Sequence, residues 1–312
     1  VYDGRVYTLD AAGTVTAFGN GGSIAWRYSV MPEGEKNPEN GFGGGLAADG
    51  GRLYAATGYG TVAALDAKTG KKFWEQKVGV PVRSSPSAAG DRVFVVTMDG
   101  VLYCLSGADG SEMWTFRGVP ERASLVNNAS PAIDGDTVIA PFSSGDVVAL
   151  KVSTGQVLWT ESLARTRSAS SLASMSDAAR PAIDGGTVFA IGHAGRMIAT
   201  SARTGERQWA ITVPSLQQPW VVAETIFVVD TSGQMLAVTR RDGKIQWTAK
   251  LPGQNVHWSG PVLAGGKLWA VSSKGTLVSV EAQTGKVAGS QELGGEVHIA
   301  PVVAGGRMYV LT

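Results

Sequence analysis

The sequence predicts an all-β fold, an eight-bladed β-propeller of four-stranded antiparallel blades, and three observations carry this prediction. First, the phrase "RLYAATGYGTVAALDAKTGKKFW" at 52–74 returns as "RVFVVTMDGVLYCLSGADGSEMW" and as "TVIAPFSSGDVVALKVSTGQVLW". Second, at six places, one in each of six successive repeats, a turn glycine is followed four positions later by a tryptophan in the predicted fourth strand. Third, these places are 38 to 50 residues apart, and a period of about forty residues is typical of propeller blades.

The glycine and tryptophan pairs recur once per unit. They are Gly22/Trp26, Gly70/Trp74, Gly110/Trp114, Gly155/Trp159, Gly205/Trp209 and Gly243/Trp247. In a seventh copy, "TGKVAG" at 284–289, Gly285 is kept but Gly289 takes the place of the tryptophan. A buried indole removes about 150–250 Å² from water. We therefore expect the six tryptophans to be structural docking residues that hold neighbouring blades together.

The fourth unit shows how the strands of a blade are assigned. "SPAIDG" at 130–135 predicts a short first strand that ends in an Asp-Gly turn, and "TVIAPF" predicts the second strand. "DVVALKV" and "QVLWTES" predict the third and fourth strands. Glycine supplies the positive φ that tight hairpin turns require. Small and β-branched residues on the inner strands, with a large ring on the outermost strand, fit a wedge-shaped blade.

The same assignment along the chain predicts a single propeller domain over 1–312. Its approximate repeats are 1–30, 43–80, 84–118, 130–163, 180–213, 219–251, 260–293 and a partial repeat at 300–312. First strands and fourth strands are each found seven times, but they are offset, because the sequence opens and stops on a second strand. This offset implies eight blades, incomplete at both termini in this chain. An open sheet edge invites aggregation, so we expect the native polypeptide to continue at both ends.

Composition excludes several classes of protein. Lysine plus arginine number 27 against 26 acidic residues, which gives no reason to expect nucleic acid or an anionic membrane surface as partner. No apolar run is long enough for a membrane-spanning helix. The single cysteine, Cys104, cannot form an internal disulfide. A lone half-buried cysteine in a strand is expected to be an inert small hydrophobic residue.

No catalytic, cofactor-binding or metal-binding constellation is predicted. His193, His257 and His298 lie in different repeats, without metal-ligand spacing to one another or to a cysteine. "GFGGGL" at 41–46 is similar to a phosphate-binding loop only in its glycines, because it precedes a strand rather than a helix N-terminus. "SLASMSD" offers serines and an aspartate but no histidine. We therefore expect a protein that is not an enzyme.

Function in a propeller is expected in loops that break the period. Three connections are long, at 27–45, 117–130 and 160–180, and each joins a fourth strand to the next first strand, so all emerge on one face. The last two flank one blade and are expected to form a single patch. That patch would contain Arg117, Glu121, Arg122, Leu125, Val126, Arg165, Arg167, Met175, Asp177 and Arg180. Apolar residues mixed with arginines are typical of a protein-binding surface, and a solvated loop is the alternative.

The repeat "GxhYAhDAxTGxxxW" resembles the tryptophan-docking repeat of the quinoprotein dehydrogenase superfamily, whose members are eight-bladed propellers. The order of the decorations is similar to that of the BamB family, the lipoprotein subunits of the outer-membrane β-barrel assembly (BAM) machine. The matching segments are "NGFGGGLAADGGRLYAATG", "SLVNNASPAIDGDTV", "MSDAARPAIDGGTVFAIGHAGRMIATSARTGERQW" and the fourth strand of blade seven without its tryptophan. The resemblance covers essentially the whole chain.

This resemblance implies a non-catalytic periplasmic scaffold of a Gram-negative bacterium that assists the folding and insertion of outer-membrane β-barrel proteins. It implies attachment to the outer membrane through an N-terminal lipid anchor that is absent from this chain. The implied partner is a BamA-like barrel subunit, bound through its POTRA domains, with nascent outer-membrane proteins as a further partner. In the family, binding depends on a leucine- and arginine-containing loop before blade four and on aspartates in the loop before blade five.

The resemblance also implies which residues make the contact. The first loop maps to "ASLVNN", where Leu125 matches a family leucine, while Ala123 and Val126 stand in place of another leucine and the arginine. The second maps to "MSDAAR", where Asp177 matches and Ala179 replaces the second aspartate. The expected partner-binding residues are Leu125, Asp177, Val126, Ala123, Arg165, Arg167, Met175 and Arg180.

Two other functions stay open from the sequence. One is a quinone-dependent dehydrogenase, but these enzymes resemble the chain only in blade pattern and carry a vicinal cysteine pair, which a single cysteine cannot supply. The other is a propeller scaffold or sensor in an unrelated complex. A signal peptide that ends in a lipidation cysteine would favour the outer-membrane function over this alternative.

Overall fold

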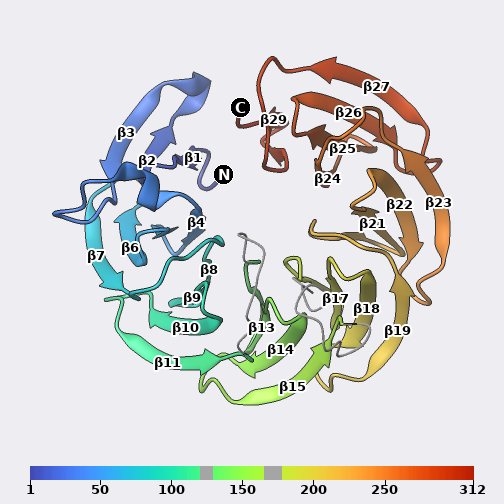
Figure 1. Ribbon diagram of the computed structural model, residues 1–312. Helices are drawn as coiled ribbons and strands as arrows, with labels where there is room; N and C mark the ends of the chain where they lie inside the picture. The colour runs from blue at the N-terminus through green and yellow to red at the C-terminus, as the bar shows by residue number, and fades with distance from the viewer. Residues whose placement is uncertain (120–128, 165–177) are drawn as a thin grey trace. The chain divides into compact units, whose positions relative to one another are not determined.

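The computed structural model describes residues 1–119, 129–164 and 178–312. Contacts between Cα atoms divide the chain into two compact units. Unit 1 contains Val1–Ser162, and unit 2 contains Leu163, Ala164 and Ala178–Thr312. Each unit consists of antiparallel sheets that follow one another in chain order (Figure 1).

Unit 1 contains four sheets, of which the first has three strands and the others four. The first sheet consists of β1 (Val6–Leu9), β2 (Thr14–Phe18) and β3 (Ile24–Ser29). The second consists of β4 (Gly44–Asp49), β5 (Arg52–Thr57), β6 (Thr61–Asp66) and β7 (Lys72–Lys77). The third consists of β8 (Ser87–Ala89), β9 (Arg92–Val96), β10 (Val101–Ser106) and β11 (Glu112–Arg117). The fourth consists of β12 (Ala132–Asp134), β13 (Thr137–Pro141), β14 (Asp146–Lys151) and β15 (Val157–Ser162).

Unit 2 contains three four-stranded sheets and a final two-stranded one. The first consists of β16 (Ala182–Asp184), β17 (Thr187–Ile191), β18 (Arg196–Ser201) and β19 (Arg207–Thr212). The second consists of β20 (Trp220–Val222), β21 (Thr225–Val229), β22 (Gln234–Thr239) and β23 (Ile245–Lys250). The third consists of β24 (Trp258–Ala264), β25 (Lys267–Ser272), β26 (Thr276–Glu281) and β27 (Val287–Glu292). The last pairs β28 (Val302–Ala304) with β29 (Arg307–Tyr309). The predicted all-β architecture is confirmed.

Short 3₁₀ turns, η1 (Asn20–Gly22) and η2 (Pro38–Gly41), are the only helical segments among the described residues. None of the helices in this part of the chain has the length and apolar character needed to cross a membrane.

A β-bulge lies beside the tryptophan position, between the last two strands of each sheet that has three or four strands. The residue opposite the tryptophan on the preceding strand is small, and the register shifts directly after that small residue. These pairs are Ala17–Trp26, Ala64–Trp74, Cys104–Trp114, Ala149–Trp159, Ala199–Trp209 and Ala237–Trp247. A bulge increases local twist and redirects the side chain beside it. In the seventh sheet of the chain, β24–β27, the pair is Ser279–Gly289, so the bulge remains although the tryptophan ring is absent.

The hydrophobic core of each unit lies between adjacent sheets. The second and third strands are almost entirely buried, whereas the fourth strands are largely exposed. In unit 1, Tyr54, Val62 and Trp74 of one sheet form a cluster with Val93 and Leu105 of the next. The second sheet also packs on the first, where Leu53 and Ala63 form a cluster with Val15. Because this sheet buries both faces within unit 1, its inner strands read as continuous runs of small and β-branched residues.

Five indoles contact the next sheet in the same way. The Nε1 atom donates to a backbone carbonyl three residues before the repeat glycine, and the ring covers that glycine. The donor and acceptor pairs are Trp26–Ala67 (3.2 Å), Trp74–Gly107 (2.9 Å), Trp114–Val152 (2.9 Å), Trp209–Arg240 (2.8 Å) and Trp247–Ala282 (3.2 Å). Trp159 is also buried. A buried indole whose N–H is satisfied combines apolar burial with a specified orientation.

Candidate partner-binding surface

The connection that leaves each fourth strand lies beside the turn between the second and third strands of the same sheet. In unit 1, the amides of Val30, Val78 and Gly118 each donate to the glycine carbonyl of that turn, at 2.8 to 2.9 Å. In unit 2, Leu251 and Leu293 do the same at 3.0 and 2.9 Å. In each unit, all these connections therefore emerge on one side of the sheets, which we call the loop face.

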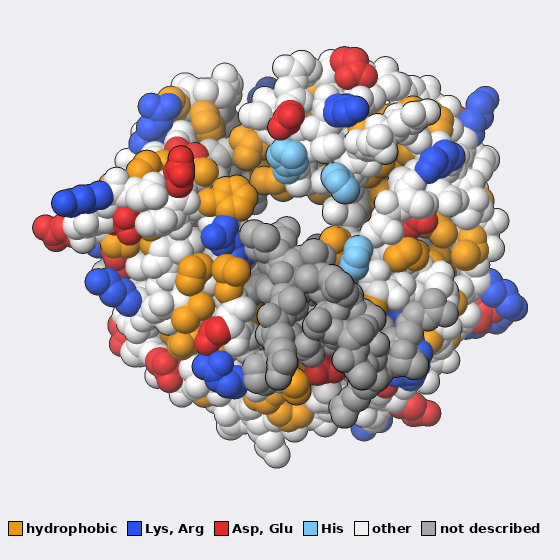
Figure 2. All heavy atoms as spheres, in the orientation of Figure 1, with side chains coloured by type: hydrophobic (Ala, Val, Ile, Leu, Met, Phe, Trp, Pro, Cys, Tyr) orange, Lys and Arg blue, Asp and Glu red, His pale blue; other side chains and the backbone are white. Residues whose placement is uncertain are grey.

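The histidine side chains lie on the face drawn in Figure 2. His193 is in the turn after β17, and His257 and His298 are in the connections before β24 and β28. Figure 2 therefore shows the loop face of unit 2. All three histidines are exposed, and His298 Nε2 lies 3.5 Å from Glu296 Oε2.

The predicted contact residues before the fourth sheet, Ala123, Leu125 and Val126, lie outside the described residues. The segment is anchored on its N-terminal side by Gly118, where a Cβ atom would lie 2.6 Å from the ring of Phe142. Next to this anchor, Arg117 forms an exposed ion pair with Asp99 at 3.2 Å. Arg117, one of the residues expected in the patch, thus forms its ion pair within its own sheet.

The predicted contact residues before the fifth sheet are described only at the edge of their segment. Arg165, Arg167, Met175 and Asp177 lie outside the described residues. Before them, Leu163 is fully buried and the carbonyl of Ala164 accepts a hydrogen bond from Arg196 Nη1 at 3.3 Å.

Beyond the segment, the chain rejoins the core of unit 2. The amide of Ala179 donates to the carbonyl of Ile191 at 2.8 Å, and the residue is 2% exposed. Position 179, where the resemblance places a second aspartate in the family, therefore packs inside the protein. Arg180 is exposed, although the surrounding protein desolvates its guanidinium enough to lower the pKa below its ordinary value. Of the predicted partner-binding set, Arg180 is the residue that the structure describes.

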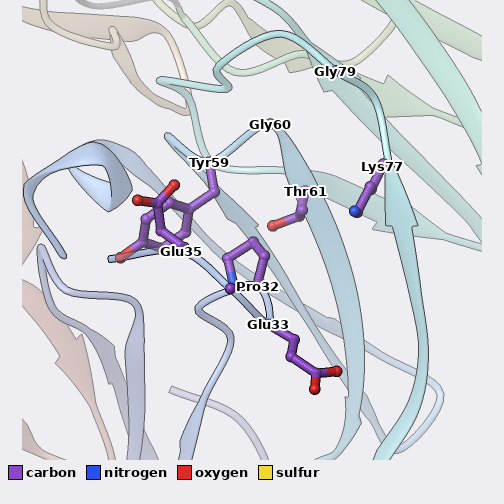
Figure 3. A pocket seen from close by; sticks show the side chains of 9 residues that line it. Pro32, Glu33, Glu35, Tyr59, Gly60, Thr61, Lys77 and Gly79 are labelled. Atoms are coloured by element: carbon purple, nitrogen blue, oxygen red, sulfur yellow. The ribbon is translucent and has the colours of Figure 1, made fainter. Parts of the chain in front are cut away.

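A shallow hollow lies on the loop face of unit 1, beside the long connection between β3 and β4. Its volume is about 320 Å³, and its lining is shown in Figure 3: Pro32, Glu33, Gly34, Glu35, Tyr59, Gly60, Thr61, Lys77 and Gly79. Glu35 accepts hydrogen bonds from the amides of Asn37 (2.8 Å) and Lys36 (2.9 Å) and from Asn40 Nδ2 (3.3 Å). The hydrogen bond from the Asn37 amide is the main cause of the lowered pKa of Glu35. The Glu35 carboxylate therefore holds the backbone of this loop in its turn.

The described residues offer little reactive chemistry. Within residues 1–119, 129–164 and 178–312, no group of three or more His, Cys, Asp or Glu side chains is placed to hold a metal ion. Cys104 is fully buried, and burial raises the pKa of its thiol to about 12. A thiol with this pKa is protonated at neutral pH and is a poor nucleophile.

Exposed apolar side chains stand on several connections of the loop face. Phe42 and Val119 lie on connections of unit 1, and Leu216 and Ile299 lie on connections of unit 2. Apolar side chains that are exposed singly are common on protein surfaces, whereas a contiguous apolar patch marks a binding site. The described part of the loop face of each unit carries apolar side chains that are available for contact with another molecule.

A family model described as outer membrane protein assembly factor BamB matches residues 11–249 and 246–312. Among curated proteins, the chain is 28% identical over 174 residues to the outer membrane protein assembly factor BamB of Nitrosomonas eutropha, which covers 55% of this chain and 40% of that protein. It is also 28% identical over 156 residues to the quinoprotein ethanol dehydrogenase of Pseudomonas aeruginosa, which covers 43% of this chain and 24% of that protein. These matches span less than half the length of the curated relatives.

Among solved structures, the fold is similar to the crystal structure of BamB from Moraxella catarrhalis. The TM-score is 0.89 at 22% sequence identity, and the match covers 99% of this chain and 91% of that one. At this level of identity the likeness shows the fold, and it confirms the predicted eight-bladed propeller class.

Proposed function

Because the chain belongs to the family of the outer membrane protein assembly factor BamB, we propose that it acts as a non-catalytic scaffold in outer-membrane protein assembly. The observation that carries this proposal is the family match over nearly the whole chain, residues 11–249 and 246–312. Relatives named as outer membrane protein assembly factor BamB support it. A loop face with exposed apolar side chains is consistent with a scaffold.

The partner we propose is a BamA-like barrel subunit, held through its periplasmic POTRA domains, with nascent outer-membrane proteins as a second class of partner. The protein would work in the periplasm, attached to the outer membrane by an N-terminal lipid anchor. The contact would use the two connections that flank the fourth sheet, β12–β15. In this proposal the rest of the propeller positions the two connections, because its side chains pack between sheets.

The proposed contact combines backbone pairing with an apolar anchor. A partner domain with a free sheet edge can pair with an exposed strand or loop by strand addition, and side chains beside the added strand give specificity. Leu125 would be the anchor, with Val126 and Ala123 beside it. Asp177 and Arg180 would form the charged rim on the following connection.

The experiment that tests this proposal measures binding of the purified protein to the POTRA domains of the cognate BamA-like subunit by titration calorimetry. Leu125→Glu is expected to weaken binding by tenfold or more, because a charge would replace the anchor at the centre of the contact. The matched control is Leu216→Glu, since Leu216 is an exposed leucine on another connection of the loop face. Circular dichroism of both variants checks the fold. Equal binding by both variants would remove the assignment of Leu125.

A quinone-dependent dehydrogenase is a second candidate, because one relative is a quinoprotein ethanol dehydrogenase. The vicinal cysteine pair implied by that resemblance is impossible here, and the single thiol, Cys104, is fully buried. Adding pyrroloquinoline quinone with calcium is therefore expected to leave the melting temperature and the absorbance spectrum unchanged. A thermal shift would favour the dehydrogenase, and a scaffold that binds no POTRA domain would point to an unrelated complex.

A further inference from the structure

Phe42 is an aromatic side chain that the loop face of unit 1 holds outside the core. It directly follows η2, and its amide donates to the carbonyl of Glu39 at 3.2 Å, which closes that turn. The side chain is 56% exposed. Large exposed rings in a fixed backbone are typical of contact sites, because aromatic residues dominate the binding energy of interfaces.

The backbone around Phe42 is fixed by close packing on neighbouring strands. The hydroxyl of Tyr59 donates to the carbonyls of Ala12 (3.0 Å) and Pro38 (3.1 Å). Gly41 lies against the ring of Tyr59, where a Cβ atom would be only 2.6 Å away. At Gly44 a Cβ atom would be 2.0 Å from the carbonyl oxygen of Ala56. Because the loop is seated in this way, Phe42 would lose little conformational freedom when a partner binds.

Arg83 lies beside the exposed ring of Phe42. Its guanidinium carbon is 5.2 Å from the centroid of the Phe42 ring, and its stem packs against Gly43. Within residues 1–119, 129–164 and 178–312, no carboxylate forms an ion pair with Arg83, and its Nε atom is buried without a hydrogen-bond partner. A guanidinium with free donors favours a carboxylate ligand.

A second pair in the same unit shows what such an arrangement binds. Arg52 lies over the ring of Phe73 at the same distance, 5.2 Å. Arg52, however, forms an ion pair with Asp91 at 3.5 Å and donates to the carbonyl of Gly107. Arg52 thus has a carboxylate and a backbone carbonyl as ligands, and among the described residues Arg83 has neither.

We propose that Phe42 and Arg83 form a further contact site, which takes an extended peptide segment of a partner protein. The segment presents an apolar side chain to the ring and a carboxylate to the guanidinium. Glu33, Glu35 and Glu39 on the same loop oppose a densely anionic surface such as a lipid bilayer. The site goes beyond the proposed function, because it uses none of the residues on the two connections that flank the fourth sheet.

The test uses a defined probe, a fluorescein-labelled eight-residue peptide with one glutamate flanked by leucines, and measures fluorescence anisotropy with the purified protein. Phe42→Ala and Arg83→Gln are each expected to weaken binding about tenfold, and Phe42→Trp should retain it. Phe73→Ala is the matched control and should leave binding unchanged. A peptide with glutamine in place of glutamate should bind the unaltered protein about as weakly as the glutamate peptide binds Arg83→Gln.

A charge reversal separates loss of contact from loss of fold. Arg83→Glu should lose the glutamate peptide and gain affinity for its lysine counterpart, which an unfolded variant would not do. The inference is overturned if the glutamate peptide fails to bind, if Phe73→Ala weakens binding as much as Phe42→Ala, or if phosphatidylglycerol vesicles displace the peptide. Since no BamA-like protein takes part in this assay, its failure is distinct from failure of the scaffold proposal.

Discussion

The indole of Trp74 occupies the space in which a side chain of Gly110 would lie. A Cβ atom at Gly110 would be 2.6 Å from Cε3 of the ring, while the Nε1 atom of the same indole donates to the carbonyl of Gly107. Trp74 lies on β7, the last strand of one sheet, and Gly110 lies in the turn between β10 and β11 of the next sheet. Two features therefore require glycine at position 110: its φ of +77° and the ring that covers it.

Gly110→Ala is expected to destabilise the protein more than Gly100→Ala. The two glycines have nearly the same φ, +77° and +75°, but nothing lies within 4 Å of a Cβ atom at Gly100. The left-handed backbone alone costs an alanine about 1–2 kcal/mol, and the clash with the indole adds about 1–3 kcal/mol. Urea unfolding of both variants measures the difference. Equal losses would mean that the ring moves aside at no cost.

Trp74→Ala is expected to lower the free energy of unfolding by about 3–5 kcal/mol, because it leaves a cavity between two sheets. The neighbouring Phe73 is 48% exposed, so Phe73→Ala is expected to cost less than about 1 kcal/mol, including its contact with Arg52. Thermal unfolding followed by circular dichroism compares the two variants. A similar loss in both would contradict the docking role of the indole.

Cys104 is expected to resist thiol reagents in the native protein. Burial raises the pKa of its thiol to about 12, and the attacking species in disulfide exchange is the thiolate. At pH 8 the native protein should release no thionitrobenzoate from Ellman's reagent within an hour, whereas the protein in urea should release one equivalent. Because the folded-state pKa is raised, the stabilising effect of the neutral thiol is lost as the pH rises above its ordinary pKa. Rapid native labelling would show that the strand opens.

The single domain over 1–312 stays a prediction, because contacts divide the chain into two compact units. If the eight sheets act as one domain, calorimetry should record a single unfolding transition whose van't Hoff and calorimetric enthalpies agree. Two separable transitions, one for each unit, would contradict the prediction. The measurement needs no variant, and Trp74→Ala, which changes only unit 1, would assign the transitions if two appear.

The sheets could be predicted from the sequence because each one is built from neighbouring hairpins. Ala149 and Trp159 face each other across one turn, so the contacts that define a blade lie within a short window of sequence. The phrase at 130–135 accordingly predicted a first strand close to β12, which spans Ala132–Asp134. The alternation of small inner residues with one outer ring is also local, and it repeats.

The features of the loop face could not be predicted in this way, because they depend on distant residues. Phe42 contacts Arg83, although all four strands of a sheet lie between them in the sequence. The glycines that follow Phe42 allow the chain to lie close to Ala56 and Ser85. In the sequence the same glycines are similar to those of a phosphate-binding loop, and only their place before a strand argues against one. Leu125 and Asp177 lie outside the described residues and remain predictions.

The central claim, that this propeller is a scaffold of outer-membrane protein assembly, is tested most directly by affinity purification of the full-length protein from detergent-solubilised membranes. We expect a BamA-like barrel subunit to be recovered in near-stoichiometric amount, and we expect Leu125→Glu to reduce this recovery while Leu216→Glu does not. Recovery of the protein without any barrel subunit, at the same yield and with the fold intact, would contradict it.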